Sequence, residues 1–134
     1  MTSRQNLIDA AIEFIKTRYP KGDDWKGAAA LETKSGRILI STAPVMPLAA
    51  TDLCHEAGAM CEAYKLDEEV TASVCVSREG GKYHILAPCG ICQERLYLWG
   101  PNVEVAVPIL EDTTQWEIKK LSEVHPYYWK NGYN

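Results

Sequence analysis

Two cysteine-containing segments of this 134-residue chain carry the residue types that bind and use a metal ion. The first is Cys54-His55-Glu56 and the second is Pro88-Cys89-Gly90-Ile91-Cys92. A catalytic zinc ion takes three protein ligands and keeps an open fourth position for water. The three cysteines supply thiolates, and the carboxylate of Glu56 can move protons without binding the metal. The two segments therefore predict a zinc site that activates water.

Three thiolates on Zn²⁺ leave a net negative charge. The elements that carry the two cysteine segments must therefore supply positive charge near the metal. A helix N-terminus carries roughly +0.5 of an elementary charge and free N–H groups that bond to anions. We expect one helix over residues 51–65, capped by Thr51 or Asp52, and a second over 89–98. Arg95 lies on the second expected helix and is either a further source of positive charge or an ordinary surface residue.

Composition indicates a soluble globular protein with one core. Hydrophobic residues make up 46% of the chain and charged residues 24%, as in ordinary globular domains, so we expect a single domain over residues 1–134. The formal charge of −4 argues against nucleic acid as a partner.

The apolar stretches are far shorter than the ~20 residues of a membrane span. The segment 1–6 lacks the apolar region of a signal peptide, which favours a cytoplasmic location with reduced thiols. Cys61 and Cys75 lie in apolar patterns and are expected to be buried structural residues.

Hydrophobic periodicity predicts helices interleaved with strands. An amphipathic helix begins near Leu7 and ends before Tyr19. Further helices are expected over 51–65, 89–98 and 117–124, and strands over 26–32, 37–41, 71–78, 83–86 and 103–109. This order predicts an α/β fold, a three-layer α-β-α sandwich around a mixed sheet of about five strands. The first two strands form a hairpin, and the later ones are joined by crossover helices.

Taken together, these features resemble the cytidine deaminase superfamily, in the small branch that includes cytidine deaminases and blasticidin-S deaminases. The resemblance spans roughly residues 7–129. It is carried by the Ala28–Leu31 hairpin strand, the two cysteine motifs and the Pro126–Trp129 tail. It implies a hydrolytic deaminase in which Cys54, Cys89 and Cys92 hold one zinc ion per chain and Glu56 is the general acid/base. It also implies a homotetramer that acts on a small molecule with a cytosine-type base, replacing its amine with oxygen and releasing ammonia.

Three residues are candidates for contact with such a substrate. The backbone N–H of His55 and the carbonyl of Ala87 are expected at the edge of the base. Trp129 ends the run Tyr127-Tyr128-Trp129, which could fold over the zinc pocket and stack on a heteroaromatic ring. Packing in the core or at a subunit contact is the alternative for this aromatic tail.

Two departures from the family pattern stand out. Nucleoside-specific members follow the second strand with an Asn-x-Glu pair that grips the ribose, whereas this chain has Ser-Thr-Ala-Pro-Val-Met-Pro at residues 41–47. Many members also have Arg after the catalytic Glu, and here that residue is Ala57. The missing carboxylate predicts weak activity on plain cytidine, because a polar clamp discriminates far better than an apolar loop.

A non-catalytic reading remains as the alternative. Structural zinc sites have four protein ligands, and His55, or the more distant His84 or His125, could supply the fourth. The chain would then be a zinc-stabilised domain that binds a ligand or a partner. The position of Glu56, two residues after Cys54, favours the catalytic site.

Overall fold

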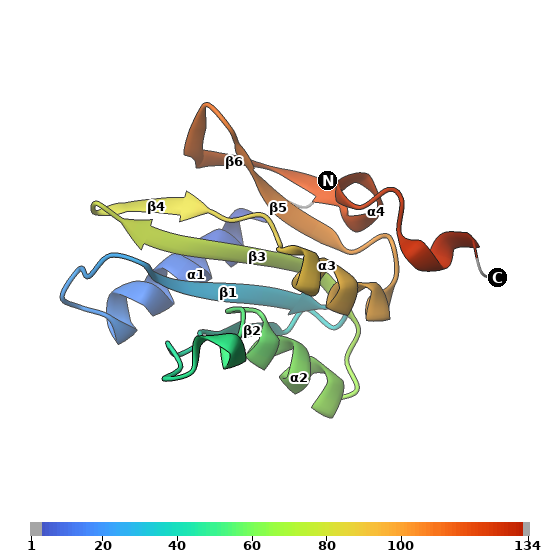
Figure 1. Ribbon diagram of the computed structural model, residues 1–134, viewed down its shortest axis with the longest axis horizontal. Coiled ribbons are helices and arrows are strands. Elements are labelled where there is room, and N and C mark those ends of the chain that lie inside the picture. Colours follow the sequence, from blue (N-terminus) through green and yellow to red (C-terminus); the bar gives the residue numbers. More distant parts are fainter. Residues whose placement is uncertain (1–3, 133–134) are drawn as a thin grey trace.

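The computed structural model describes residues 4–132. Residues 1–3, half of the segment 1–6 on which the signal-peptide expectation rests, lie outside the described part. Within that part, six strands form one mixed sheet (Figure 1). The strands β1, β2, β3, β5 and β6 follow the order β2-β1-β3-β5-β6, and β4 pairs with β3 off this path. β3 and β5 pair in parallel, and the other neighbours are antiparallel. Their bounds are Lys26–Thr33 (β1), Ile38–Ser41 (β2), Val70–Glu79 (β3), Lys82–Ile85 (β4), Glu104–Ile109 (β5) and Asp112–Lys120 (β6).

Helices cover both faces of the sheet, which confirms the three-layer α/β sandwich. α1 (Gln5–Arg18) lies behind the sheet in Figure 1, and α3 (Gly90–Leu96) lies in front of it with α2 (Ala57–Lys65). A short α4 (Leu121–Val124) follows β6. No helix among the described residues is both long enough and apolar enough to cross a membrane.

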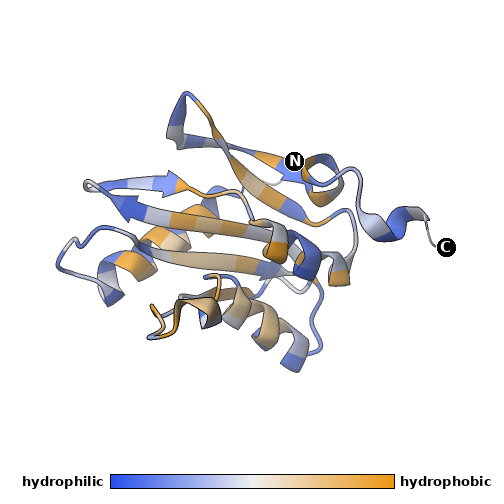
Figure 2. Cartoon of the chain, viewed as in Figure 1, coloured by the Kyte–Doolittle hydropathy of each residue, from blue (hydrophilic) through white to orange (hydrophobic). Residues whose placement is uncertain are grey.

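The central strands are buried on both faces, and their alternating side chains divide the core in two. Ala28 and Ala30 of β1 pack in the cluster that contains α1. Ala29 and Leu31 pack in the cluster that contains α2 and α3. In Figure 2 the hydrophobic colour follows β1, β3 and β5 through the middle of the molecule. Small alanines on both faces let the helices approach β1 closely, and close packing of this kind makes a protein interior rigid.

The helix expected over 51–65 is wrong in its first half. The chain makes a single 3₁₀ turn at Ala49–Thr51, runs irregularly to a turn at residues 55–56, and begins α2 only at Ala57. Cys54 and Glu56 therefore lie before the helix and not on it. The expected second helix ends at Leu96 and continues as a 3₁₀ turn over Tyr97–Trp99.

The helix expected over 117–124 is also wrong for residues 117–120, which belong to β6. Trp116 and Ile118 pack together against the cluster beside α1. They pair with Pro108 and Ala106 of β5. Pairing with β5 overrides the local preference for helix, and only Leu121–Val124 remains helical. The sheet thus has six strands, five of them on the continuous path.

Candidate active site

Three cysteine sulfurs converge beside the front face of the sheet. The Sγ atoms of Cys54, Cys89 and Cys92 all lie within 4.8 Å of one another, and the Cys54 and Cys89 sulfurs are 3.3 Å apart. A zinc ion with Zn–S bonds of about 2.3 Å in tetrahedral geometry holds its thiolates about 3.8 Å apart. All three cysteines are free thiols. The spacing of the three sulfurs therefore fits a zinc ion.

The two segments reach the cluster in different ways. Cys89 is the residue immediately before α3, and Cys92 is buried in its first turn. Burial acts to raise the pKa of Cys89, but the backbone N–H groups of Cys92 and Ile91, together with the Cys54 thiol, lower it overall. Burial raises the pKa values of Cys54 and Cys92. The backbone N–H groups at the start of α3 thus favour the thiolate form of Cys89.

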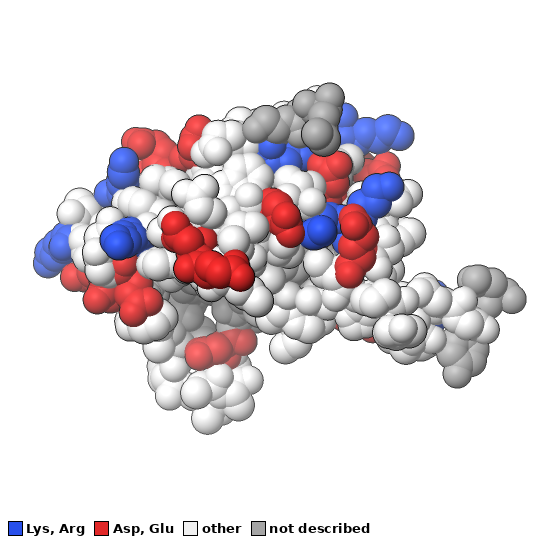
Figure 3. All heavy atoms as spheres, turned by 90° about the horizontal axis from the view of Figure 1, so that it is seen from above, with Lys and Arg blue, Asp and Glu red and all other residues white. Residues whose placement is uncertain are grey.

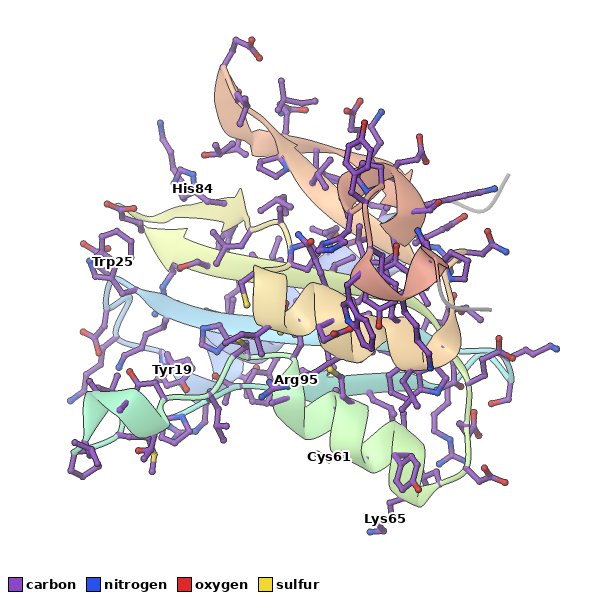
Figure 4. All side chains as sticks on the ribbon, turned by 45° about the vertical axis from the view of Figure 1, so that its right-hand side comes forward. Tyr19, Trp25, Cys61, Lys65, His84 and Arg95 are labelled. Atoms are coloured by element: carbon purple, nitrogen blue, oxygen red, sulfur yellow. The ribbon has the colours of Figure 1, made fainter. Side chains whose placement is uncertain are left out.

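Glu56 lies against this cluster without belonging to it. It occupies the position just before α2, and only 4% of its surface is exposed. Burial raises its pKa, while bonds to its own backbone N–H and to the thiols of Cys92 and Cys75, and the charge of Arg95, act in the opposite direction. Figure 4 shows Arg95 reaching from α3 toward the start of α2. A buried carboxyl group with a raised pKa beside a metal site is suited to proton transfer.

The other two cysteines differ from each other. Cys75 of β3 is buried, as expected, and its thiol contacts Glu56. Cys61 was expected to be buried as well, but it is exposed on α2. It lies on α2 (Figure 4) and is one of the residues that line an open cleft between α2 and α3. Cys61 is therefore a surface residue of this cleft and not part of the core.

A serine that the sequence did not single out holds the turn at 54–56. The Ser41 hydroxyl, at the end of β2, donates to the His55 carbonyl at 2.5 Å. It also accepts from the Ala59 N–H of α2 at 2.9 Å. No side chain within the segment caps α2, so Ser41 supplies the cap from another element. A Cβ on Gly58 would lie 3.0 Å from the Ser41 Cβ, and glycine is what allows this close approach.

Neither expected capping residue performs that task. The Thr51 hydroxyl donates to the Leu48 carbonyl at 2.7 Å. The Asp52 carboxylate accepts from the Met46 N–H at 2.9 Å. Both bonds stabilise the irregular segment before α2. The cap could not be read from the local sequence because its donor and acceptor come from elements far apart in the chain.

None of the three histidines joins the sulfur cluster in the described part of the chain. His55 Nδ1 accepts from the Ala43 N–H at 3.2 Å. His84 contacts Thr113 at 2.6 Å, and His125 contacts Gln93 at 2.7 Å. Burial lowers the pKa of His55, which keeps its ring neutral and able to accept. The four-ligand structural site is therefore disfavoured.

The C-terminal tail packs on α3 of its own chain. The rings of Tyr128 and Tyr97 stack with centroids 3.7 Å apart. Trp129 Nε1 donates to Glu94 Oε1 at 2.5 Å, and Trp129 is 61% exposed. Ala87, the other expected substrate contact, is exposed just before Pro88. Contact of His55, Ala87 and Trp129 with a substrate stays a prediction.

The tail is also connected to the second cysteine segment. His125 Nδ1 donates to the side-chain oxygen of Gln93. The Gln93 amide in turn donates to the Pro88 carbonyl at 2.9 Å, and the Tyr97 hydroxyl donates to the His125 carbonyl at 3.0 Å. Gln93 thus joins the tail to the residue that precedes Cys89. No local sequence pattern predicts this connection, because its bonds join residues up to 32 positions apart.

Comparison with solved structures identifies the family. A cytidine deaminase from Bacillus anthracis matches 97% of this chain and 91% of its own, with 41% identity and a TM-score of 0.87. The chain belongs to the cytidine deaminase superfamily. Two cytidine deaminases of lower identity share the fold. The one from Mycobacterium tuberculosis is 19% identical, covers 96% of this chain and 98% of its own, and has a TM-score of 0.75. The one from Burkholderia pseudomallei is 22% identical, covers 94% of this chain and 98% of its own, and has a TM-score of 0.70. No protein-family model matches this superfamily member, and a search of curated proteins finds no significant match.

Zinc binding to the metal-free protein should release protons. Thiols bind zinc as thiolates, and the raised pKa values of Cys54 and Cys92 mean that both are protonated beforehand. Because protons compete with the metal, apparent affinity should fall as the pH is lowered. Calorimetry in buffers of different ionisation enthalpy measures both effects. We expect one zinc ion per chain and a large loss of affinity in Cys92→Ser, with Cys61→Ser as the matched control. A fourth protein ligand at the metal would contradict the assignment.

Proposed function

We propose that this protein is a zinc-dependent hydrolytic deaminase that replaces the exocyclic amine of a cytosine-type base with oxygen and releases ammonia. One observation carries the proposal: a buried carboxyl group, Glu56, lies against a cluster of three cysteine sulfurs without belonging to it. Family membership supports the same chemistry. The cluster is suited to hold zinc through Cys54, Cys89 and Cys92, and Glu56 is the proposed general acid/base.

The chain's own residues have distinct tasks in this mechanism. When bound, zinc supplies Lewis-acid activation of water at its open position. Glu56 takes the two protons of the attacking water in turn, passing the first to the ring nitrogen and the second, which comes from the new hydroxyl group, to the departing amine, so that amine and water become carbonyl and ammonia. The backbone N–H of His55 and the carbonyl of Ala87 orient the base. Burial of Glu56 excludes bulk water from these proton transfers.

The proposed substrate is a small molecule. The chain carries 18 acidic and 14 basic residues, and Figure 3 shows the two kinds interspersed on one face rather than in a basic stripe. Nucleic-acid binding depends on clustered positive charge. We propose a cytoplasmic location, where free thiols stay reduced.

A catalytic role is favoured over a zinc-stabilised binding domain. A structural site has a closed set of four ligands, and only three ligand groups meet within residues 4–132. Burying a carboxyl group without full compensation is costly, and a purely structural zinc site would not need it. Ammonia release by the purified protein with a panel of aminated pyrimidines distinguishes the two functions.

Replacing Glu56 with Gln should leave the fold and zinc content intact and lower kcat by roughly 10²–10⁴-fold, because an amide cannot transfer the protons. Metal analysis and steady-state ammonia assays on the same preparation measure both quantities. The exposed Glu62→Gln on α2 serves as the matched control. Near wild-type turnover by Glu56→Gln would exclude the mechanism.

Within this chemistry, we propose a cytosine compound with an altered or absent ribose, of the blasticidin-S kind. The 43–47 loop, Ala-Pro-Val-Met-Pro, has no carboxylate or amide side chain that could bond to sugar hydroxyls. Loss of a hydrogen bond to a charged group costs roughly 1.5–3 kcal/mol, or about 10–150-fold in affinity. The exposed aromatic tail offers stacking in place of those bonds.

The specificity prediction is higher kcat/KM for blasticidin S than for cytidine, measured side by side. Trp129→Ala should lower activity if the tail covers a pocket and leave it unchanged if Trp129 only packs against α3. Efficient turnover of cytidine, above about 10⁵ M⁻¹ s⁻¹, with no blasticidin S activity would show that the missing clamp is replaced from another segment.

We further propose a homotetramer in which neighbouring chains help to line each pocket. An apolar cleft of about 890 Å³ lies between α2 and α3, with Tyr64, Tyr97, Leu98 and Trp99 among its lining residues. Tyr64 is 72% and Leu98 63% exposed. Exposed apolar side chains that gather around one cleft favour a contact with another protein chain.

Light scattering at micromolar concentration should therefore give four times the mass of the chain. Leu98→Glu should shift the protein to smaller species, because it introduces a charge into the cleft. Lys65→Glu, at the end of α2 in Figure 4, is the control for added negative charge outside the lining. A wild-type monomer would refute the proposal.

A further inference from the structure

The 43–47 loop is held by side chains from the segment that carries Cys54 and Glu56. Pro44 and Pro47 have no N–H group, so the loop has three backbone donors. Two of them bond to side chains: the Ala43 N–H to Nδ1 of His55 at 3.2 Å, and the Met46 N–H to Oδ1 of Asp52 at 2.9 Å. The loop and the cysteine segment therefore form one connected unit.

The His55 ring has a site prepared for it on β1. A Cβ on residue 27 would lie 2.7 Å from Nε2 of His55, so the ring occupies the space that glycine leaves open. The neighbouring Thr42 hydroxyl donates to the Gly27 carbonyl at 2.6 Å. It also contacts the Tyr19 hydroxyl at 3.1 Å. These contacts fix the start of the loop and the floor under the imidazole at the same time.

The backbone of His55 is held independently of its ring. The Ser41 hydroxyl bonds to its carbonyl and to the Ala59 N–H of α2. Loss of the imidazole would therefore leave the turn that carries Cys54 and Glu56 in place while removing the acceptor for the Ala43 N–H of the 43–47 loop. The two functions of residue 55, in the catalytic turn and in the loop, can be separated by substitution.

We propose that His55 is the positioning residue of the 43–47 loop, whose Nδ1 atom fixes the pocket wall that meets the sugar or side group of the substrate. This inference rests on the proposed deaminase function. The loop has no polar side chain with which to bind the substrate, so its contribution to affinity comes from where it is held. His55 accordingly affects substrate binding rather than the chemical step.

Two substitutions separate the acceptor from the bulk of the ring. Asn places its Oδ1 close to the position of the imidazole Nδ1 and keeps an acceptor for the Ala43 N–H, whereas Leu fills similar space without one. His84→Leu is the matched control, because it removes an imidazole that contacts Thr113 between β4 and β6. Figure 4 shows His84 on β4, well away from Arg95.

The experiment measures kcat, KM and zinc content for the zinc-loaded wild type and the three variants, with cytidine and blasticidin S as substrates. His55→Leu should raise KM about 3–10-fold, the range for one lost hydrogen bond, with kcat and zinc content unchanged. His55→Asn should restore most of the wild-type KM, and His84→Leu should match the wild type. The inference would be overturned if His55→Leu had the wild-type KM, or if it lost zinc and kcat instead. It would also be overturned if His55→Asn and His55→Leu raised KM equally.

Amide hydrogen exchange keeps this result separate from failure of the proposed function. His55→Leu should accelerate exchange at Ala43 and leave Ala59 protected, because Ser41 still holds α2. A wild type that deaminates no substrate would refute the proposed function and, with it, the role of His55 in substrate binding. Unchanged exchange at Ala43 in His55→Leu would refute the positioning contact itself, whatever the activity.

Discussion

The site depends on bringing together thiols that are distant in the chain and holding them without help from a long helix. Cys54 and Cys89 are 35 residues apart, yet their sulfurs lie 3.3 Å from each other. A rigid central sheet makes this possible, because β1 and β3 are buried on both faces and the two cysteine segments pack on the same side. Small side chains along β1 let α2 and α3 approach closely, so small shifts in the core would separate the sulfurs.

Local sequence was sufficient for the parts of the fold that follow regular hydrophobic periodicity. The first helix, the opening hairpin and the cysteine triplet were all predictable, because each depends on nearby residues or on a specific motif. The start of α2 was not. Thr51 and Asp52, as candidate caps, suggested a start at residue 51, but the chain between Ala49 and Ala57 is held by bonds to Leu48, Met46 and Ser41. Such contacts across elements leave no local pattern.

Residues 117–120 were expected in a helix but belong to β6, and here too a contact with another element decides the local structure. Trp116 and Ile118 alternate with polar residues, as in a strand with one buried face. Glu and Lys nearby favour helix, and a short segment does not settle the choice. The partner strand β5 decides it by supplying backbone hydrogen bonds and a buried surface. Strand preference depends on this packing context more than on the residues themselves.

The connection from the tail through Gln93 to the Pro88 carbonyl has a practical consequence for anyone who alters the chain's end. Tyr127 and Trp129 are largely exposed, which suggests that the tail could be removed without harm. Trimming the chain before His125 would nevertheless remove the donor that orients the Gln93 amide. Affinity tags and fusion partners should therefore be attached beyond Trp129. Shortened versions of the protein should likewise keep the residues up to Trp129.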